Sequence, residues 1–438
     1  MPDIVLINPW IYDFAAYDLW AKPLGLLRLG AILRARGYEV ALIDALDPFH
    51  PELPRLPKRR LYGTGHYFRQ KIPKPWTLGD VPRDFARYGL PTSLFLKELK
   101  RLGRPQLFVV TSLMTYWYPG VVETVRLIKR VYPETPVIVG GLYVTLCPEH
   151  ARIVLEGAEV VPGGLEKVLK VVEEKTVASG TTPPHPYPVF DLLRNLPYVV
   201  IATSFGCPFA CRYCASRILN PVFQQRPPRE VVEEIKFWHE RFGVKDFAFY
   251  DDALLVNFEG HLALILEEIL HRGLKVRFHT PNALHVRLVT KEVARLLRRA
   301  GFVTIRFGFE TLNPERHREL DGKVEAEELR QTLAYMREAG FKKRELGVYL
   351  LWGLPGQGFE EVWRSAEFVA ASGGSPYLAE YSPIPGTPLY EEARQVSRYP
   401  LDEDPLYHNN TAFPCLTEPD WTAIEGLKRR VRALREMA

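Results

Sequence analysis

Three of the five cysteines in this 438-residue chain lie close together in one short stretch. They are Cys207, Cys211 and Cys214, and Gly206 and Pro208 beside the first of them favour a loop. A loop can fold three thiolates around one inorganic centre, and soft sulfur ligands suit zinc or an iron–sulfur cluster. Structural zinc takes four ligands, and no fourth cysteine or histidine lies nearby in the sequence. Three cysteines would instead leave one iron of a four-iron cluster open to another ligand.

The spacing Cys-x3-Cys-x2-Cys, with Tyr213 before the last cysteine, resembles the radical S-adenosylmethionine (SAM) superfamily. In that family three cysteines hold a [4Fe-4S] cluster, and the open iron binds the amino and carboxylate groups of SAM. The resemblance implies that the reduced cluster cleaves SAM to methionine and a 5′-deoxyadenosyl radical, with electrons from an external donor such as flavodoxin or ferredoxin. A zinc site and chance crowding of cysteines are the alternatives.

Composition fits an ordinary globular protein, with 47% hydrophobic and 25% charged residues. A net charge of +5 is mild for this length and gives no case for a nucleic-acid partner. The N-terminus has no signal-peptide pattern, and no apolar run approaches the length of a membrane span. The isolated Cys147 and Cys415 do not complete a disulfide framework. We therefore expect a cytoplasmic protein.

The first part of the chain alternates short apolar runs with helical patterns, which predicts an α/β domain over residues 1–180. Its expected strands are residues 3–8, 39–43, 106–111, 136–139 and 159–161. Five such strands predict an open, doubly wound (Rossmann-like) parallel sheet. A proline- and arginine-rich insertion at about 48–98 is too long for a bare loop, so we expect order or function there.

The second part repeats strand and helix six times over residues 190–395, after a proline-rich linker at 176–188 where we place the domain boundary. The expected strands are residues 198–203, 246–250, 275–279, 303–309, 345–352 and 376–381. Six repeats predict a partial (β/α)6 barrel, with the cysteine loop at the carboxyl end of its first strand, where barrels build active sites. A short C-terminal extension, 396–438, ends in an amphipathic helix that we expect to cap the barrel.

Polar residues and glycines follow the other barrel strands. By strand alternation Arg306, Gly308 and Glu310 share one face, so a purely structural Arg–Glu pair is one interpretation. The stretches at residues 308–311 and 353–356 look like SAM-contacting elements of the superfamily, with Tyr213 beside the adenine. The resemblance gives these candidates for SAM contacts: Tyr213, Asp251, Asn282, Arg306, Glu310 and Gly353.

An open sheet ahead of such a barrel resembles the radical SAM class whose N-terminal domain binds cobalamin. The motif Asp-x-His-x-x-Gly, which supplies a histidine ligand to cobalt, is absent. The resemblance implies that Gly140, Gly141 and Gly163 contact the cobalamin nucleotide tail at the carboxyl edge. Tight turns explain these glycines about as well. The aromatic candidates for lining, or filling, the same pocket are Tyr116, Trp117 and Tyr143.

The resemblance implies a cobalamin-dependent methyltransferase that acts on an unactivated carbon of a small molecule or natural product. Methylcobalamin would supply the methyl group, and a second SAM would regenerate it. One alternative keeps the radical chemistry but gives a rearrangement, ring closure or coupling, with a vestigial N-terminal domain. Another is a non-catalytic binding protein stabilised by a metal. The sequence identifies neither the substrate nor a catalytic residue.

We predict that alanine at Cys207, Cys211 or Cys214 abolishes both cluster assembly and SAM cleavage, because three protein ligands are the minimum once one iron is reserved for SAM. Iron content and methionine release measure the two losses. Alanine at Cys147 or Cys415 is the control and should lose no iron. A loop variant that still cleaves SAM at the wild-type rate would contradict the ligand assignment.

Overall fold

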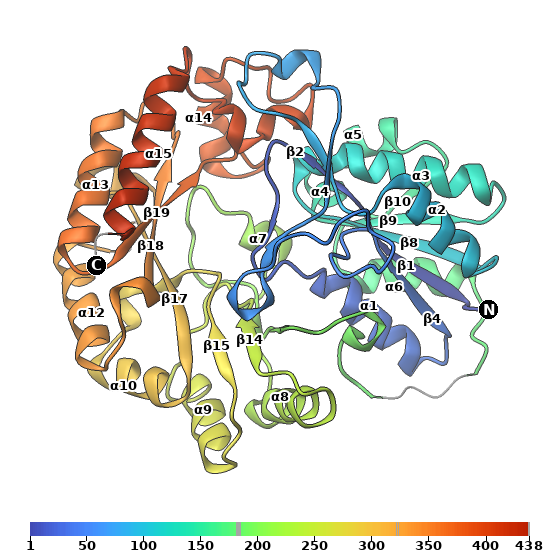
Figure 1. Cartoon of the computed structure of the whole chain (residues 1–438), viewed down its shortest axis with the longest axis horizontal. Helices are drawn as coiled ribbons and strands as arrows, with labels where there is room; N and C mark the ends of the chain where they lie inside the picture. The colour runs from blue at the N-terminus through green and yellow to red at the C-terminus, as the bar shows by residue number, and fades with distance from the viewer. Residues whose placement is uncertain (181–184, 321, 323, 437–438) are drawn as a thin grey trace. The chain divides into compact units, whose positions relative to one another are not determined.

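The computed structural model describes residues 1–180, 185–320, 322 and 324–436, and the chain forms two compact units (Figure 1). Unit 1 comprises Met1–Leu196 with Pro400–Ala412, and unit 2 comprises Pro197–Tyr399 with Phe413–Ala438. The expected linker at 176–188 therefore falls within unit 1, and its residues 181–184 lie outside the described part of the chain. The expected extension at 396–438 is not a unit of its own, because its residues divide between the two units.

Unit 1 is built on a parallel sheet of five strands in the order β10-β9-β8-β1-β4, as the sequence predicts. The strands are β1 (Ile4–Asn8), β4 (Val40–Asp44), β8 (Leu107–Ser112), β9 (Val137–Gly141) and β10 (Glu159–Val160). The β1 strand has neighbours on both sides, and its five residues are all buried. Burial on both faces explains why this strand reads as a continuous apolar run.

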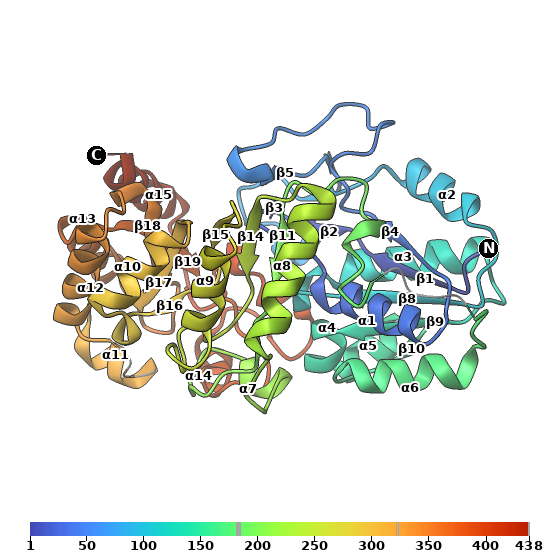
Figure 2. The same cartoon turned by 90° about the horizontal axis from the view of Figure 1, so that it is seen from below.

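Helices cover both faces of this sheet (Figure 2). Val5 and Ile7 of β1 pack in one core with Phe95 and Val121 from the helices of one face. Leu6 points the other way, against Gly30 of α1 (Leu24–Ala35). The helices that flank the sheet are α1 (Leu24–Ala35), α2 (Thr92–Arg101), α3 (Tyr118–Val131) and α6 (Leu165–Lys175), with the short α4 (Leu142–Leu146) and α5 (Pro148–Val154) after β9. This is the expected doubly wound architecture.

The insertion at about 48–98 is ordered by pairing with the loop that follows β1. An antiparallel three-stranded sheet joins β2 (Ile11–Asp13), β7 (Ala86–Tyr88) and β6 (Arg69–Lys71), and a two-stranded one joins β3 (Tyr17–Asp18) and β5 (Gly65–His66). The Arg59 guanidinium pairs with Asp18 and also donates to the Gly63 carbonyl. The segment is thus a small satellite of unit 1.

Unit 2 confirms the partial barrel, with six parallel strands in the order β11-β14-β15-β17-β18-β19. The strands are β11 (Val199–Ile201), β14 (Asp246–Phe249), β15 (Arg277–His279), β17 (Phe302–Glu310), β18 (Leu346–Trp352) and β19 (Ser375–Glu380). The short β16 (Leu284–His285) also pairs with β17. The outer helices are α8 (Pro228–Phe242), α9 (Leu262–His271), α10 (Lys291–Arg299), α12 (Ala326–Glu338) and α13 (Phe359–Ala371) (Figure 1).

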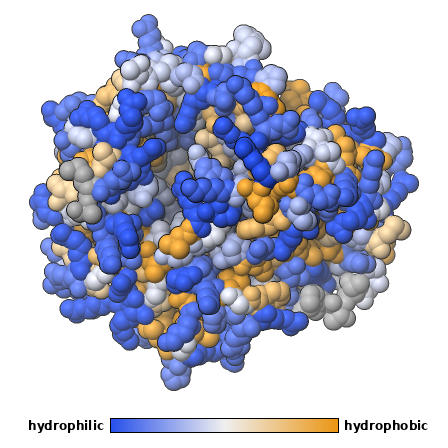
Figure 3. All heavy atoms as spheres, viewed as in Figure 1, coloured by the Kyte–Doolittle hydropathy of each residue, from blue (hydrophilic) through white to orange (hydrophobic). Residues whose placement is uncertain are grey.

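The C-terminal helix α15 (Trp421–Glu436) packs on the barrel, as its apolar face predicts. Lys428 pairs with Glu380 at 3.1 Å, and the Lys343 ammonium donates to the Leu434 carbonyl at 3.0 Å. In the described residues no helix is long and apolar enough to cross a membrane. The face drawn in Figure 3 is largely hydrophilic, with apolar side chains in scattered patches.

Two helical glycines of unit 1 give a matched test of this packing. A Cβ on Gly120 in α3 would overlap the Trp10 carbonyl oxygen, whereas a Cβ on Gly25 in α1 would meet open space. We expect Gly120→Ala to destabilise unit 1 by about 1–3 kcal/mol through overpacking. Gly25→Ala should be neutral or stabilising by up to about 1 kcal/mol through helix propensity. Thermal unfolding measures both, and equal effects would contradict the packing of α3.

Candidate active site

The three cysteines lie on a loop between the first barrel strand and the short α7 (Ser216–Leu219). The loop opens with β12 (Ser204–Phe205), which pairs with β13 (Gln224–Gln225). Gly206 follows with φ +75°, and a Cβ there would lie 2.5 Å from the Val222 carbonyl oxygen. Only glycine fits this close approach, so the chain turns sharply just before Cys207.

The thiols are half-buried at Cys207 and Cys211 and exposed at Cys214. Through the described parts of the chain, no three His, Cys, Asp or Glu side chains converge on a point where one metal ion would bind. Structural zinc takes four protein ligands, whereas the loop supplies three thiolates. In a [4Fe-4S] cluster each cysteine binds its own iron, so the three sulfurs surround the cluster instead. The donor set of three loop thiolates fits the cluster.

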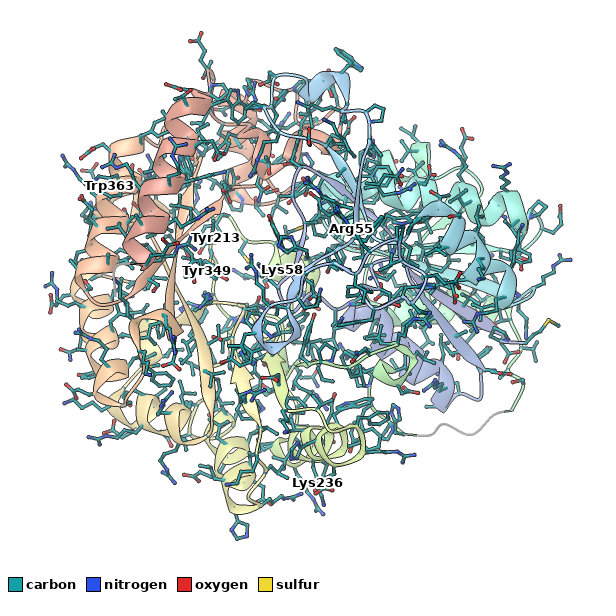
Figure 4. The ribbon with its side chains drawn as sticks, in the orientation of Figure 1. Arg55, Lys58, Tyr213, Lys236, Tyr349 and Trp363 are labelled. Carbon is teal, nitrogen blue, oxygen red and sulfur yellow. The ribbon has the colours of Figure 1, made fainter. Side chains whose placement is uncertain are left out.

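Side-chain contacts fasten this loop to the barrel. The Tyr213 hydroxyl donates to Glu310 Oε1 at 2.9 Å, and the Phe209 ring stacks on His285 with centroids 3.8 Å apart. Arg212 pairs with Glu392 on α14 (Pro388–Val396). The hydroxyl of Tyr213, a residue labelled in Figure 4, thus meets the end of β17, and the place beside the SAM adenine that the resemblance implies stays a prediction.

Glu310 ends β17 in a strained backbone conformation. Its φ is +66°, and the register between β17 and β18 shifts between Gly308 and Glu310. A Cβ on Gly308 would lie 2.8 Å from Glu310 Oε1, so the glycine makes room for the carboxylate. Non-glycine residues with positive φ are costly and cluster at functional sites. This carboxylate, at the carboxyl end of the barrel beside the cysteine loop, is the strongest candidate for a SAM contact.

Arg306 lies on β17 four residues before Glu310, about 13 Å along the strand, and the register of β17 shifts between the two. Its guanidinium stacks on the Tyr377 ring at 4.5 Å from the centroid and donates to the Ile305 carbonyl at 2.9 Å. Tyr349, also labelled in Figure 4, lies on the neighbouring strand β18. The SAM contact expected of Arg306 is therefore not supported, because its side chain is engaged deeper in the barrel.

Asp251 is also engaged within the chain. It is buried, and its carboxylate accepts hydrogen bonds from the Thr203 amide, the Thr203 hydroxyl and the Ser204 hydroxyl. These bonds direct the carboxylate to the start of the cysteine loop, so the structure does not support the SAM contact expected of Asp251. Asn282 is exposed at the carboxyl end, and its amide donates to the Tyr250 carbonyl at 3.0 Å.

Gly353 is held by a residue that the sequence reading missed. Gln357 is buried, and its Oε1 accepts from the amides of Gly353 (3.0 Å) and Leu354 (3.3 Å). Gly353 has φ +84°, and a Cβ there would lie 2.9 Å from the Phe413 ring. Since its amide is already bonded, Gly353 shapes the turn and does not donate to SAM. No motif marks Gln357, because its role depends only on the turn it fills.

In unit 1 the strand order reverses between β1 and β8, which is where sheets of this type bind ligands. Asn8 ends β1 at this point, 2% exposed, and its Nδ2 donates to Asp44 Oδ1 at 2.8 Å. Its Oδ1 has no hydrogen-bond partner among the described residues. Burial raises the pKa of Asp44 to about 6. An unpaired buried acceptor at the switch point is a feature that a bound ligand would satisfy.

The predicted glycines all lie at the carboxyl edge of this sheet. Gly141 has φ +106°, and a Cβ there would overlap the Ser112 carbonyl oxygen. A Cβ on Gly140 would lie 3.0 Å from a methyl of Val168, and the Gly163 amide donates to the Thr145 hydroxyl at 3.0 Å. Close packing within unit 1 thus accounts for Gly140 and Gly141, as the tight-turn interpretation allowed.

The aromatic candidates fill this edge of unit 1. Tyr143 is fully buried and its hydroxyl bonds His150 Nδ1 at 2.7 Å, and Tyr116 is 3% exposed. The half-buried Trp117 donates from Nε1 to Asp13 Oδ2 at 2.7 Å. Tyr116 and Tyr143 therefore do not line an open face in this structure, and only Trp117 stays partly accessible.

Residues 400–412 pack at the carboxyl edge of the sheet in unit 1. The sequence did not predict that this segment belongs to the N-terminal unit. Asn409 Nδ2 donates to Asp13 Oδ1 at 2.8 Å, and both residues are buried. His408 accepts from the Thr115 hydroxyl through Nδ1 (2.9 Å) and donates to the Leu401 carbonyl through Nε2 (2.9 Å). Burial lowers the pKa of His408 to about 4. Both ring nitrogens are in use, so His408 is not free to bind a metal.

Comparisons with known proteins support the assignment of the cysteine loop to a radical SAM site. Residues 201–369 match the model of the Radical SAM superfamily, and this span holds all three loop cysteines. This span is a Radical SAM domain, and its recognition from the cysteine motif is confirmed. The protein is accordingly an enzyme whose cofactors include a [4Fe-4S] cluster and SAM, which sets aside the non-catalytic interpretation.

Three similar proteins carry the word methyltransferase in their descriptions. An uncharacterized methyltransferase of Pyrococcus horikoshii is 24% identical over 347 residues, covering 70% of this chain and 73% of that one. Cytidylyl-2-hydroxyethylphosphonate methyltransferase of Streptomyces wedmorensis is 21% identical, covering 89% and 81%. The structure of the radical SAM methyltransferase TsrM from Kitasatospora setae, with cobalamin and a [4Fe-4S] cluster bound, superposes with a TM-score of 0.67 at 17% identity, covering 99% and 89%. That likeness confirms the fold class.

Proposed function

We propose that this enzyme is a cobalamin-dependent radical SAM methyltransferase that acts on an unactivated carbon of a small molecule. The observation that carries the proposal is that one chain contains both a doubly wound sheet and a radical SAM barrel. The sheet reverses its strand order between β1 and β8, which is where sheets of this type bind ligands. The relatives support it, since their descriptions name methyl transfer, and TsrM has structures with cobalamin and with tryptophan as substrate.

The residues at the switch point fit a corrinoid whose cobalt has no protein ligand. His408 uses both ring nitrogens within unit 1, so it does not offer a ligand to the cobalt. The unpaired Oδ1 of Asn8 could accept a hydrogen bond from one of the amide groups around a corrin ring. When bound, the corrinoid supplies the methyl group and the cluster the electron for SAM cleavage, while the protein orients the cofactors and excludes water.

For SAM, we assign the leading contact to Glu310, held by Tyr213, with Asn282 as a further polar group at the same edge. A carboxylate there would bind the SAM ammonium. The finer expectations on partners stay predictions: an external electron donor such as flavodoxin or ferredoxin, a cytoplasmic location and no nucleic-acid partner.

The second candidate function keeps SAM cleavage but uses no corrinoid, giving a rearrangement, ring closure or coupling. The burial of Tyr116 and Tyr143 favours it, because these rings fill space that a lined pocket would leave open. Corrinoid binding distinguishes the two candidates.

Glu310→Gln should weaken SAM binding by about ten- to a hundredfold, because a charge-assisted hydrogen bond contributes about 1.5–3 kcal/mol. Equilibrium binding to the reconstituted protein measures this, and iron content should not change. Tyr213→Phe is the matched control, since it removes the hydroxyl bonded to Glu310 and keeps the charge. It should cost less affinity than Glu310→Gln. Unchanged SAM affinity in Glu310→Gln, with lost folding stability, would make Glu310 structural.

Anaerobic reconstitution with hydroxocobalamin should give close to one corrinoid per chain, and the loaded enzyme should transfer methyl groups from SAM. Asn8→Leu, which removes the unpaired acceptor, should lower corrinoid binding with little loss of iron from unit 2. Absorbance after gel filtration measures both. Wild-type protein with an intact cluster and no bound corrinoid would refute the methyltransferase and leave the second candidate function.

A further inference from the structure

Two adjacent carboxylates after β14 hold the cysteine loop at its two ends. Asp251 contacts the chain just before the first cysteine, and Asp252 contacts it just after the last one. The loop between these anchors carries every thiolate of the cluster. Neither carboxylate belongs to the cysteine motif, and each is hydrogen-bonded to one end of the loop.

The Asp251 anchor is buried and accepts hydrogen bonds from three donor groups. The Thr203 amide donates to both carboxylate oxygens, at 3.1 and 3.0 Å, and the hydroxyls of Thr203 and Ser204 each donate to Oδ1 at 2.6 Å. Thr203 is fully buried and Ser204 is 4% exposed. Hydrogen bonds to a buried carboxylate are strong and directional. They fix the direction in which the chain leaves β11 toward the turn at Gly206.

The Asp252 anchor reaches a thiol. Its Oδ2 accepts a hydrogen bond from the Ser216 hydroxyl, and the Ser216 amide donates to Cys214 Sγ at 3.4 Å. Ser216 is also the first residue of α7, so its place sets where that helix begins. Ser216 therefore connects the Asp252 carboxylate, the first turn of α7 and the sulfur of Cys214.

A third strand supports the acidic pair. Asn282, after β15, donates from Nδ2 to the carbonyls of Tyr250 (3.0 Å) and Asp251 (3.4 Å). These bonds hold the backbone that presents the two carboxylates. Loops from three neighbouring strands, β11, β14 and β15, are thus joined around the cysteine loop.

We propose that Asp251 and Asp252 are positioning residues for the iron–sulfur cluster, which act by fixing the two ends of the loop that binds it. The proposal rests on the radical SAM assignment of this site and not on corrinoid binding or methyl transfer. Groups that orient metal ligands typically change metal affinity or activity by about 10- to 100-fold when removed. Because the cysteines themselves remain, the cluster should still assemble and be held loosely.

The test uses the whole chain after anaerobic reconstitution. Near the surface, Asp252→Asn removes the charge of the second anchor and Ser216→Ala removes its hydrogen bond. Asp251→Asn disturbs the buried anchor, because an amide group cannot accept every bond that the carboxylate accepts. Asp246→Asn is the matched control. Asp246 is a buried carboxylate at the other end of β14, paired with Arg277 and His279 and away from the loop. The measurements are iron per chain, the rate of iron loss to a chelator, the electron paramagnetic resonance spectrum with and without SAM, and thermal unfolding.

We expect about tenfold faster iron loss in Asp252→Asn and Ser216→Ala, with an altered spectrum and near wild-type thermal stability. The double variant should lose iron no faster than Ser216→Ala alone, because both changes act on one interaction. Asp251→Asn should lose iron faster still, whereas Asp246→Asn should lose thermal stability but hold its iron.

Three results would overturn the proposal. In the first, Asp252→Asn and Ser216→Ala keep wild-type iron retention and spectra. In the second, Asp251→Asn and Asp246→Asn lose iron alike and only in step with unfolding. In the third, the effects of Asp252→Asn and Ser216→Ala add fully. If wild-type protein cleaves SAM but transfers no methyl group, only the methyltransferase proposal fails, and these comparisons still decide the role of the acidic pair.

Discussion

The candidate active site depends on one constraint, the parallel arrangement of the barrel strands. In a parallel sheet every strand delivers its following loop to the same edge, so groups far apart in sequence meet there. The cysteine loop after β11, the acidic pair after β14, Asn282 after β15 and Glu310 at the end of β17 are brought together in this way. The contact between Tyr213 and Glu310, 97 residues apart, is one product of that constraint.

The same constraint operates in unit 1, with a different outcome. Its carboxyl edge gathers Asn8, Ser112 and Gly141, but here most groups are satisfied within the chain. Residues 400–412 add Asn409 and His408 to this edge, so a segment near the C-terminus finishes a domain that begins at the N-terminus. The acceptor of Asn8 remains as a polar group that the described residues leave unmatched.

Two carboxylates of unit 2 have different roles in the site. Asp251 is buried and surrounded by donors, so it organises the chain, whereas Glu310 is half-buried at a strained position and accepts a hydrogen bond from Tyr213. Strain of this kind persists only where surrounding structure imposes it. We infer that Asp251 holds the cysteine loop in place, whereas Glu310 contacts the bound SAM.

The sequence alone determined the class of this protein, because a cluster site needs three thiolates at short spacing and that spacing is local. It also determined both sheets, since strand and helix periods are local patterns of apolar residues. It could not determine which polar residue serves a ligand, and for Asp251, Arg306 and Gly353 it named residues whose groups bond elsewhere in the chain. Nor could it find Gln357, Asn409 or Ser216, whose partners are set by the turn or strand that folding brings beside them. Only the tertiary structure decided these roles, because hydrogen-bond satisfaction is a property of neighbours in space.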